Sequence, residues 1–539
     1  MRKLLKGKWL LLLVVVLSMV LVLAACGPAD DDPPPPVDDD DDEEDVVKEG
    51  GELVIALAWE PDPVIDPYKL GWGNLPLDLF EGFLANTWDF VPGPGIAESW
   101  EFEDDGRVQI YKIRQDKYFH DGTQINAENM KHYFELLIDP EVDSPSIWDF
   151  AFISEMEVVD EFTLKIILEN PFPAALYNFA WGGGWGGLQN PEAWEEYGPW
   201  GEDIYGTEVV VGTGPFKFVE WIPGDRMVLE RFEDYKSPPI FENEGPAYLD
   251  KVTYRFIFDA ATRMMEFEVG NVHILETVPP EFADQIRNMD DATLIEEDSW
   301  EVVYIGMPCD KAPFDDVRVR QALNLAINQQ ELVDVVWMGL AEPAYGYVSP
   351  KFGDAYSGDP ETFGFDLERA KDLLTEAGYP DGFTAQLAVE NRTDWVTAAE
   401  VIKDMLEEIG VTADIRQYER AGFYDLLRAG EQDMFIRSHS WYGLDILPWY
   451  FHSRNFPYPN YHRYVNEEMD QRFDEADYSN TFEEMVERYM DIQADLAKEA
   501  IWVPLVHPFD LIGIRDEVQD LRIHVMYGIR YNVDTWLKK

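Results

Sequence analysis

The chain has 539 residues, of which 46% are hydrophobic, which is enough to build a large core divided between more than one lobe. Its 106 acidic and 42 basic residues give a net charge of -64, and such a surface repels nucleic acid and anionic lipid head groups, so neither is an expected partner. Only two cysteines are present, which excludes a disulfide framework.

The amino terminus has the pattern of a secretory signal. Basic residues precede the apolar run Leu10–Leu23, whose length of about 14 residues is short of the roughly 20 that a membrane-spanning helix needs. The following Leu23-Ala-Ala-Cys26 resembles the lipobox of bacterial lipoproteins. This resemblance implies a signal peptide over residues 1–25, lipidation of Cys26 and anchoring outside the cytoplasm, in the periplasm or on the outer face. A plain secreted protein is the alternative.

A tether is predicted over residues 26–49. This stretch contains four consecutive prolines and a run of acidic residues. Because it cannot bury apolar surface and its charges repel one another, we expect it to be solvated and disordered.

The first half of the remaining chain predicts mainly strands. Glu52–Leu57 has the composition of a buried strand, and turn residues at the centre of three segments predict hairpins over Trp100–Ile113, Val158–Leu168 and Phe216–Phe232. Alternation then predicts a half-buried strand whose inward-facing residues are Val252, Tyr254, Phe256 and Phe258.

The second half alternates strand and helix. Asp366 can cap a helix that ends before Gly378, and a clean apolar stripe predicts another helix from Ala398 to Ile409. This order predicts an α/β lobe with parallel pairing, in which ligands bind at the carboxyl ends of strands. The intervening segments are predicted as strands at 383–389, 411–418 and 434–436, with a short helix at 423–429.

Five segments, in order, resemble the peptide-type solute-binding proteins of bacterial transporters, known as family 5. They cover nearly all of residues 50–525. They are Gly50–Leu57 (GGELVIAL), the stretch from Ala97-Glu-Ser-Trp100 to Ala127-Glu-Asn129, Gly212–Phe218 (GTGPFKF), Pro313–Leu323 (PFDDVRVRQAL) and Ala370–Pro380 (AKDLLTEAGYP).

The resemblance implies an α/β fold with two lobes, of the periplasmic-binding-protein-like type II cluster, with mixed sheets and an extra inserted subdomain. Two chain crossings, near residues 303 and 505, would form a hinge between the lobes. Lobe 1 would comprise residues 50–92, 206–302 and 506–539, the inserted subdomain residues 93–205, and lobe 2 residues 303–505.

The resemblance also implies a function. A monomer without catalytic residues, cofactor or metal would capture di- to oligopeptides between its lobes and deliver them to the permease subunits of an ABC importer. An oligosaccharide-binding or nickel-chelate-binding member of the family is an alternative, and a secreted glycoside hydrolase or a sensor is one from another class. Asp and Glu pairs are so numerous that they do not decide for or against a hydrolase.

Segment 434–453 contains the leading candidates for ligand contact. In peptide-binding relatives an aromatic and two small residues precede an aspartate that pairs with the peptide's amino terminus. Tyr442-Gly-Leu-Asp445 resembles this pattern, and Trp441 fits with one inserted residue. A carboxylate screened from water can hold an ammonium group through charge-assisted hydrogen bonds. The second acid usual in relatives is replaced by Leu447, and a turn-capping role for Asp445 is the alternative.

Tryptophans are the second group of candidates. Trp181 and Trp185 enclose three glycines, and flat aromatic faces suit sugar rings, peptide side chains or cations. Trp59 and Trp300 flank strands expected at the cleft. Most aromatic residues of such a chain belong to its core, so these are hypotheses. The predicted ligand-binding residues are Asp445, Tyr442, Trp441, Trp59, Trp181 and Trp185.

Overall fold

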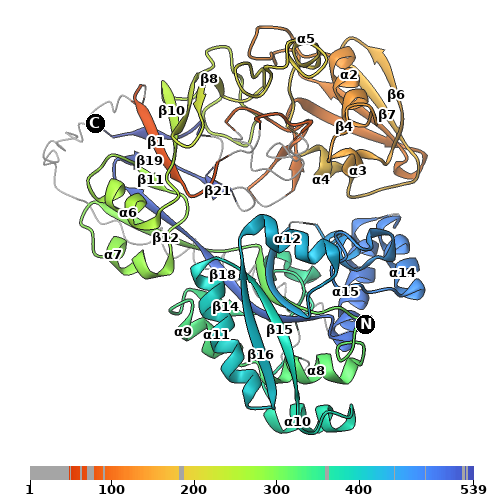
Figure 1. Ribbon diagram of the computed structural model, residues 1–539. Coiled ribbons are helices and arrows are strands. Elements are labelled where there is room, and N and C mark those ends of the chain that lie inside the picture. Colours follow the sequence, from red (N-terminus) through yellow and green to blue (C-terminus); the bar gives the residue numbers. More distant parts are fainter. Residues whose placement is uncertain are drawn as a thin grey trace, which may run out of the picture. The chain divides into compact units, whose positions relative to one another are not determined.

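The computed structural model describes most of the chain after residue 47, and residues 48–539 form one compact unit (Figure 1). Cys26, Trp181, Trp185 and Tyr442 lie outside the described residues. Within the described part, no helix has both the length and the apolar character needed to cross a bilayer. The described residues are 48, 50–60, 64–69, 78–88, 91–180, 187–358, 363–441, 443–479, 481–524, 528–529 and 532–538.

A mixed sheet of twelve strands runs through the described residues in the order β16-β15-β17-β13-β18-β11-β1-β10-β9-β8, with β12 and β14 also pairing with β18. The strands are β1 (Glu52–Leu57), β8 (Phe216–Ile222), β9 (Arg226–Arg231), β10 (Lys251–Phe256), β11 (Ile274–Leu275), β12 (Ala292–Asp298), β13 (Glu301–Gly306), β14 (Ala341–Pro343), β15 (Phe383–Glu390), β16 (Val411–Tyr418), β17 (Met434–Ser440) and β18 (Trp502–Arg515).

Strand β18, with 14 residues, connects the two halves of this sheet. Its residues 502–506 pair antiparallel with β13, and its residues 509–515 pair antiparallel with β12. Only Ser299 and Trp300 separate β12 from β13, so the chain crosses between the two halves once between these strands and once within β18. Because both strands pair with β18, the two crossings lie side by side. A hinge at these crossings stays a prediction.

The strands predicted early in the chain are present in the structure, but the strand that begins at Lys251 ends earlier than predicted. β1 pairs parallel with β10, and the inward residues Val252, Tyr254 and Phe256 are buried as predicted. Phe258, however, is 57% exposed. The strand ends at Phe256 because Asp259 caps α6 (Ala260–Glu268) by accepting a hydrogen bond from the Thr262 amide, which turns the chain out of the sheet.

The α/β pattern predicted for the second half is confirmed. β15 pairs parallel with both β16 and β17, and α11 (Thr393–Glu407) packs on β15 and β16. α10 (Leu367–Glu376) begins at Asp366, whose side chain accepts the Arg369 amide. Other helices of this half are α8 (Val317–Ala326), α9 (Gln329–Val335), α12 (Arg420–Ala429), α13 (Ile446–Phe451), α14 (Glu467–Asp477), α15 (Phe482–Glu499), and the 3-10 helices η3 (Pro350–Ala355) and η4 (Ser453–Asn455).

A separate antiparallel sheet has the order β4-β5-β7-β6 (orange in Figure 1), and it contains two of the three predicted hairpins, while the third forms β8 and β9 of the large sheet. α2 (Ala127–Leu137) packs on β6 and β7 and begins at Asn126, which forms a capping box with Asn129. The elements of this part are β4 (Ala97–Glu103), η1 (Asp104–Gly106), β5 (Val108–Ile113), α3 (Ile147–Phe150), β6 (Ile153–Asp160), β7 (Thr163–Leu168), α4 (Ala175–Phe179) and α5 (Pro191–Tyr197).

The largest apolar cluster joins these two parts of the molecule. It contains Phe134 and Phe179 from beside the four-stranded sheet, and Tyr450, Leu496 and Trp502 from the second half. Separate clusters fill the α/β lobe and the region around β1 and β10. The remaining elements are β2 (Ala85–Asn86), β3 (Pro92–Gly93), η2 (Pro280–Phe282), α7 (Ala283–Arg287), β19 (Val518–Gln519), β20 (Ile523–His524), β21 (Gly528–Ile529) and β22 (Trp536–Leu537).

Candidate ligand-binding site

A cavity of about 570 Å³ lies between the part that carries the four-stranded sheet and the α/β half. α3, α4 and the loop before α4 supply one wall, while η3, the loop after β17, the end of α14 and the first turns of α15 supply the other. Trp88, Val91 and Trp300 complete the lining. Residues far apart in the sequence therefore share one enclosed space of ordinary ligand-site size.

Asp445 occupies the N-cap position of α13, but its side chain makes no capping hydrogen bond. Instead, the indole Nε1 of Trp441 donates to its Oδ1 at 3.1 Å. A Cβ atom at Gly443 would collide with the same oxygen, so glycine at this position allows the carboxylate to lie close to Trp441. The loop thus turns the Asp445 carboxylate toward the cavity.

The surroundings of Asp445 favour a positively charged ligand. Its side chain is accessible to water inside the cavity, yet protein surrounds the carboxylate on most sides, and this desolvation raises its pKa, against the lowering effect of the Trp441 hydrogen bond. No basic side chain of the described residues forms an ion pair with it. A carboxylate in this state gains most from a cation that enters its surroundings.

Two further aspartates line the same cavity. Desolvation, and then the nearby Asp445 carboxylate, raises the pKa of Asp149 in α3 well above its ordinary value. Asp477, at the end of α14, accepts a hydrogen bond from the Tyr489 hydroxyl, but desolvation raises its pKa to about 7. Asp445 contributes to both shifts by repulsion, so its carboxylate acts on each of the other two in the same cavity.

Aromatic rings supply the apolar part of the lining. Tyr177 of α4 stacks on Phe482 of α15 with ring centroids 5.5 Å apart and planes 25° from parallel, so this pair joins the two walls directly. Trp300 packs edge-on against Phe352 of η3 at 4.9 Å. Rings of this kind can contact apolar groups or the faces of cations.

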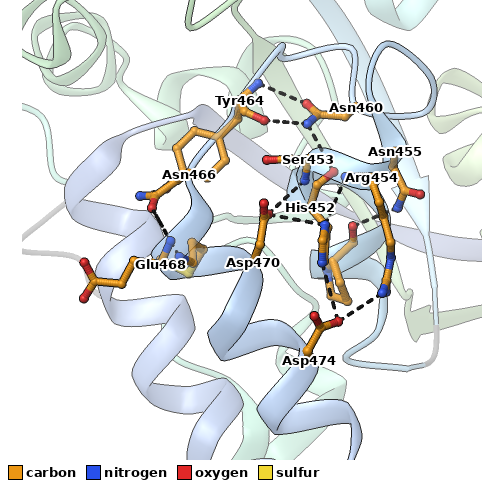
Figure 2. Close-up of polar contacts among 12 residues, drawn as sticks. His452, Ser453, Arg454, Asn455, Asn460, Tyr464, Asn466, Glu468, Asp470 and Asp474 are labelled. Carbon is orange, nitrogen blue, oxygen red and sulfur yellow. Dashed lines mark hydrogen bonds and ion pairs between the residues drawn. The ribbon is translucent and has the colours of Figure 1, made fainter.

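A polar network holds the chain directly after α13 against α14 (Figure 2). His452, directly after α13, contacts Asp470 and Asp474 of α14 at 3.3 and 3.5 Å. The Arg454 amide donates to its Nδ1, which places the imidazole proton on Nε2, toward Asp474. Arg454 also bonds Asp474 and approaches Asp477 at 3.8 Å. The network therefore attaches the end of α13 to α14, whose last residue is Asp477.

The structure brings some of the predicted site residues together and not others. Trp441 and Asp445 line the cavity, as does Trp300. Trp59 lies elsewhere, partly buried against the core around β1 and β10. Tyr442, Trp181 and Trp185 lie outside the described residues.

Sequence reasoning missed Asp149 and Asp477. Asp149 lies between Trp148 and Phe150, and an acid enclosed by aromatic residues is a weak signal of a functional carboxylate. Asp477 ends a helix rich in acidic residues, and nothing nearby in the sequence distinguishes it.

A second hollow, of about 630 Å³, is formed within the α/β half by residues of α8, α10 and α15. It shares no lining residue with the cavity around Asp445. Among the residues that the structure describes, no group of three or more His, Cys, Asp or Glu is arranged to hold a metal ion.

Comparison with known proteins decides the family. The family model described as bacterial extracellular solute-binding proteins, family 5, matches residues 91–467, which is well over half of the chain. The chain belongs to this family. Family 5 consists of solute-binding proteins rather than enzymes, and its members act outside the cytoplasm.

Relatives and solved structures agree with the family. The glutathione-binding protein GsiB of Salmonella typhimurium is 30% identical over 444 residues, which cover 79% of this chain and 83% of GsiB. The fold resembles that of DppA from Helicobacter pylori in complex with the peptide STSA, with a TM-score of 0.77, 22% identity and coverage of 91% and 99%. The fold also resembles that of AppA from Bacillus subtilis in complex with a nonapeptide. The TM-score is 0.77 at 22% identity, and the match covers 91% of this chain and 100% of AppA. The predicted two-lobed α/β fold of this family is thereby confirmed.

Proposed function

We propose that this family 5 protein is the substrate-binding lipoprotein of an ABC importer and captures peptides in the cavity that contains Asp445. The ammonium group at the peptide's amino terminus binds the Asp445 carboxylate, and the aromatic walls contact the peptide's apolar groups. The protein works by enclosing its ligand between two lobes, without making or breaking covalent bonds.

The observation that carries this proposal is the state of Asp445. Its carboxylate lines the cavity, is oriented by Trp441, and has no ion-pair partner among the described residues. An ammonium group would supply that partner, and charge-assisted hydrogen bonds formed away from bulk water are strong. Peptides are the ligands named for DppA and AppA, and glutathione, itself a tripeptide, is the ligand named for GsiB.

The other parts of the proposal rest on the sequence. Lipidation of Cys26 anchors the chain, and residues 26–49 give the folded body its reach from the membrane. Lobe 1 comprises residues 50–92, 206–302 and 506–539, with the insertion at 93–205 and lobe 2 at 303–505. Closure about the β12–β13 and β18 crossings then presents the loaded form to a permease. Tyr442, Trp181 and Trp185 remain candidate contacts.

Asp445→Asn tests the anchor role while keeping the shape of the side chain. We expect it to weaken peptide binding by at least about 30-fold, since removing one member of a buried charge pair costs about 2–5 kcal/mol. The measurement is isothermal titration of the full chain in detergent with di- to pentapeptides. Asp372→Asn, at an exposed position of α10, is the matched control and should bind like the wild type.

Two outcomes would contradict the proposal. Unchanged peptide affinity in Asp445→Asn would remove the anchor role. Binding of oligosaccharides with no binding of peptides would favour the oligosaccharide-binding alternative, and turnover of a glycan would favour a hydrolase.

A further inference from the structure

We infer that the cavity selects ligands with two positively charged groups: one binds Asp445, and the other lies between Asp149 and Asp477. A ligand of this class is a peptide with a lysine or arginine side chain, or a free diamine. The inference rests on the proposed function, because it concerns the same cavity and adds the class of ligand.

The charge of the lining is strongly one-sided. Four carboxylates face the cavity, from Asp149, Asp354, Asp445 and Asp477, against the single amine of Lys351. No arginine lines the cavity within the described part of the chain. A ligand with one positive group would leave most of this negative charge unbalanced, at a cost that rises as water is excluded.

Lys351 does not neutralise the aspartates, because its ammonium is engaged elsewhere. It donates to the backbone carbonyl of Asp298 and lies over the Trp300 ring, 5.6 Å from the centroid. None of the three aspartates forms an ion pair with it. Apart from Arg454, which lies 3.8 Å from Asp477 and is not part of the lining, no basic side chain of the described residues forms an ion pair with these three aspartates.

The lining favours a place for the second cation near Asp149 and Asp477. These residues come from opposite walls of the one cavity, α3 and α14, and the Asp445 carboxylate acts on each of them. The stacked pair Tyr177 and Phe482 lines the cavity beside them. An alkyl ammonium or guanidinium side chain suits this combination, since its stem packs on rings while its head meets carboxylates.

Ligand binding is coupled to protons. Desolvation, and then repulsion from Asp445, raises the pKa of Asp149 well above its ordinary value, and desolvation raises the pKa of Asp477 to about 7, so Asp477 holds a proton over part of the neutral range. A cation between them favours the ionised forms. The second positive group therefore enters with proton release, whereas a neutral side chain enters without it.

The test compares matched ligands on the full chain by isothermal titration. The pair is Ala-Lys-Ala and the same peptide with acetylated lysine, which has the same stem but no charge, together with corresponding pentapeptides. We expect the charged peptide to bind at least about tenfold more tightly than the acetylated one, because hydrogen bonds to a charged group contribute more than hydrogen bonds to a neutral group. It should also release more protons when titrated in buffers of different ionisation enthalpy. Glutathione, with net negative charge, should bind more weakly than either.

Variants assign the preference to the two aspartates. Asp149→Asn and Asp477→Asn should each reduce the ratio of the affinity for the charged peptide to the affinity for the acetylated peptide toward one. The affinity for the acetylated peptide itself should be kept. Retained binding of the acetylated peptide shows that each variant is folded. Glu467→Gln, at an exposed position in the first turn of α14 and outside the cavity lining, is the matched control and should keep the ratio of the two affinities.

The outcomes separate this inference from the proposed function. Equal affinity for charged and acetylated peptides overturns the inference and leaves the proposed function standing. Binding of neither peptide, nor of any other peptide, overturns the proposed function. Tight binding of 1,5-diaminopentane without peptide binding supports selection for two cations and identifies a free diamine as their source.

Discussion

At the scale of single residues, the three aspartates of the cavity differ in what holds them. Asp445 is oriented by Trp441, Asp477 by Tyr489, and Asp149 has no ion-pair partner among the described residues. Arg454 lies 3.8 Å from Asp477, whereas no basic side chain of the described residues forms an ion pair with Asp149 or Asp445. Such groups destabilise the free protein slightly and are compensated by the ligand.

Asp477 makes stability depend on pH. Its pKa of about 7 exceeds the ordinary 3.8, so between these values the folded chain holds a proton that the unfolded chain has released. Stability therefore falls as pH rises from about 4 to 7. Besides Tyr489, the groups that act on Asp477 are Arg454, Asp474 and Asp445. Asp477→Asn cannot ionise, so we expect the variant to gain stability relative to the wild type between pH 5 and pH 8.

Urea unfolding of both proteins at these two pH values, without ligand, measures this effect. Asp259→Asn is a suitable control, because its cap lowers the pKa of Asp259 and leaves it ionised throughout the range. Parallel stability profiles for Asp477→Asn and the wild type would show that Asp477 is already ionised at pH 5.

At the scale of elements, the connection from α13 to α14 determines the geometry of the acidic wall. His452 contacts Asp470 and Asp474, and desolvation lowers its pKa, which favours the neutral imidazole (Figure 2). We expect His452→Ala to reduce the free energy of unfolding by about 1–3 kcal/mol. We also expect weaker peptide binding, because α13, which begins at Asp445, loses its attachment to α14.

Chemical denaturation and titration with a peptide measure both effects. His132→Ala is the control, since its contact with Glu195 at 3.3 Å lies on the surface of α2 and such pairs contribute little. A His452→Ala variant with full stability and unchanged affinity would mean that packing alone holds the loop.

The elements were largely predictable, because local rules determine them. Asp366 marks the start of α10, and the alternation of strands and helices after it predicts the parallel pairing of β15 with its neighbours. The helix start at Thr393 was missed, because the apolar stripe is clear only from Ala398 onward. The end of β10 was misplaced because Phe258 continues the alternation although Asp259 already starts a helix.

The site was only partly predictable. Asp445 and Trp441 belong to one segment with a recognisable pattern, whereas Asp149 and Asp477 reach the same cavity from α3 and α14. No spacing rule connects residues that are hundreds of positions apart, so the fold had to be known before the acidic lining could be seen. The glycine-rich segment 181–187, with Trp181 and Trp185, lies almost wholly outside the described residues.

At the scale of the whole molecule, the family assignment and the topology support one mode of action. Two halves of a sheet share β18, and a cavity with an aromatic and acidic lining lies between the four-stranded sheet and the α/β half. Closure around a ligand would remove both the ligand and the aspartates from water, which strengthens every charged contact inside. The strong net negative charge of the chain adds attraction for cationic ligands at long range.

A crystal structure of the full chain with a lysine-containing peptide tests the central claim most directly. We predict that the peptide's terminal ammonium lies within hydrogen-bond distance, about 2.7–3.2 Å, of the Asp445 carboxylate, and that the lysine ammonium lies between Asp149 and Asp477. A peptide bound elsewhere, or one whose amino terminus points away from Asp445, would contradict this assignment.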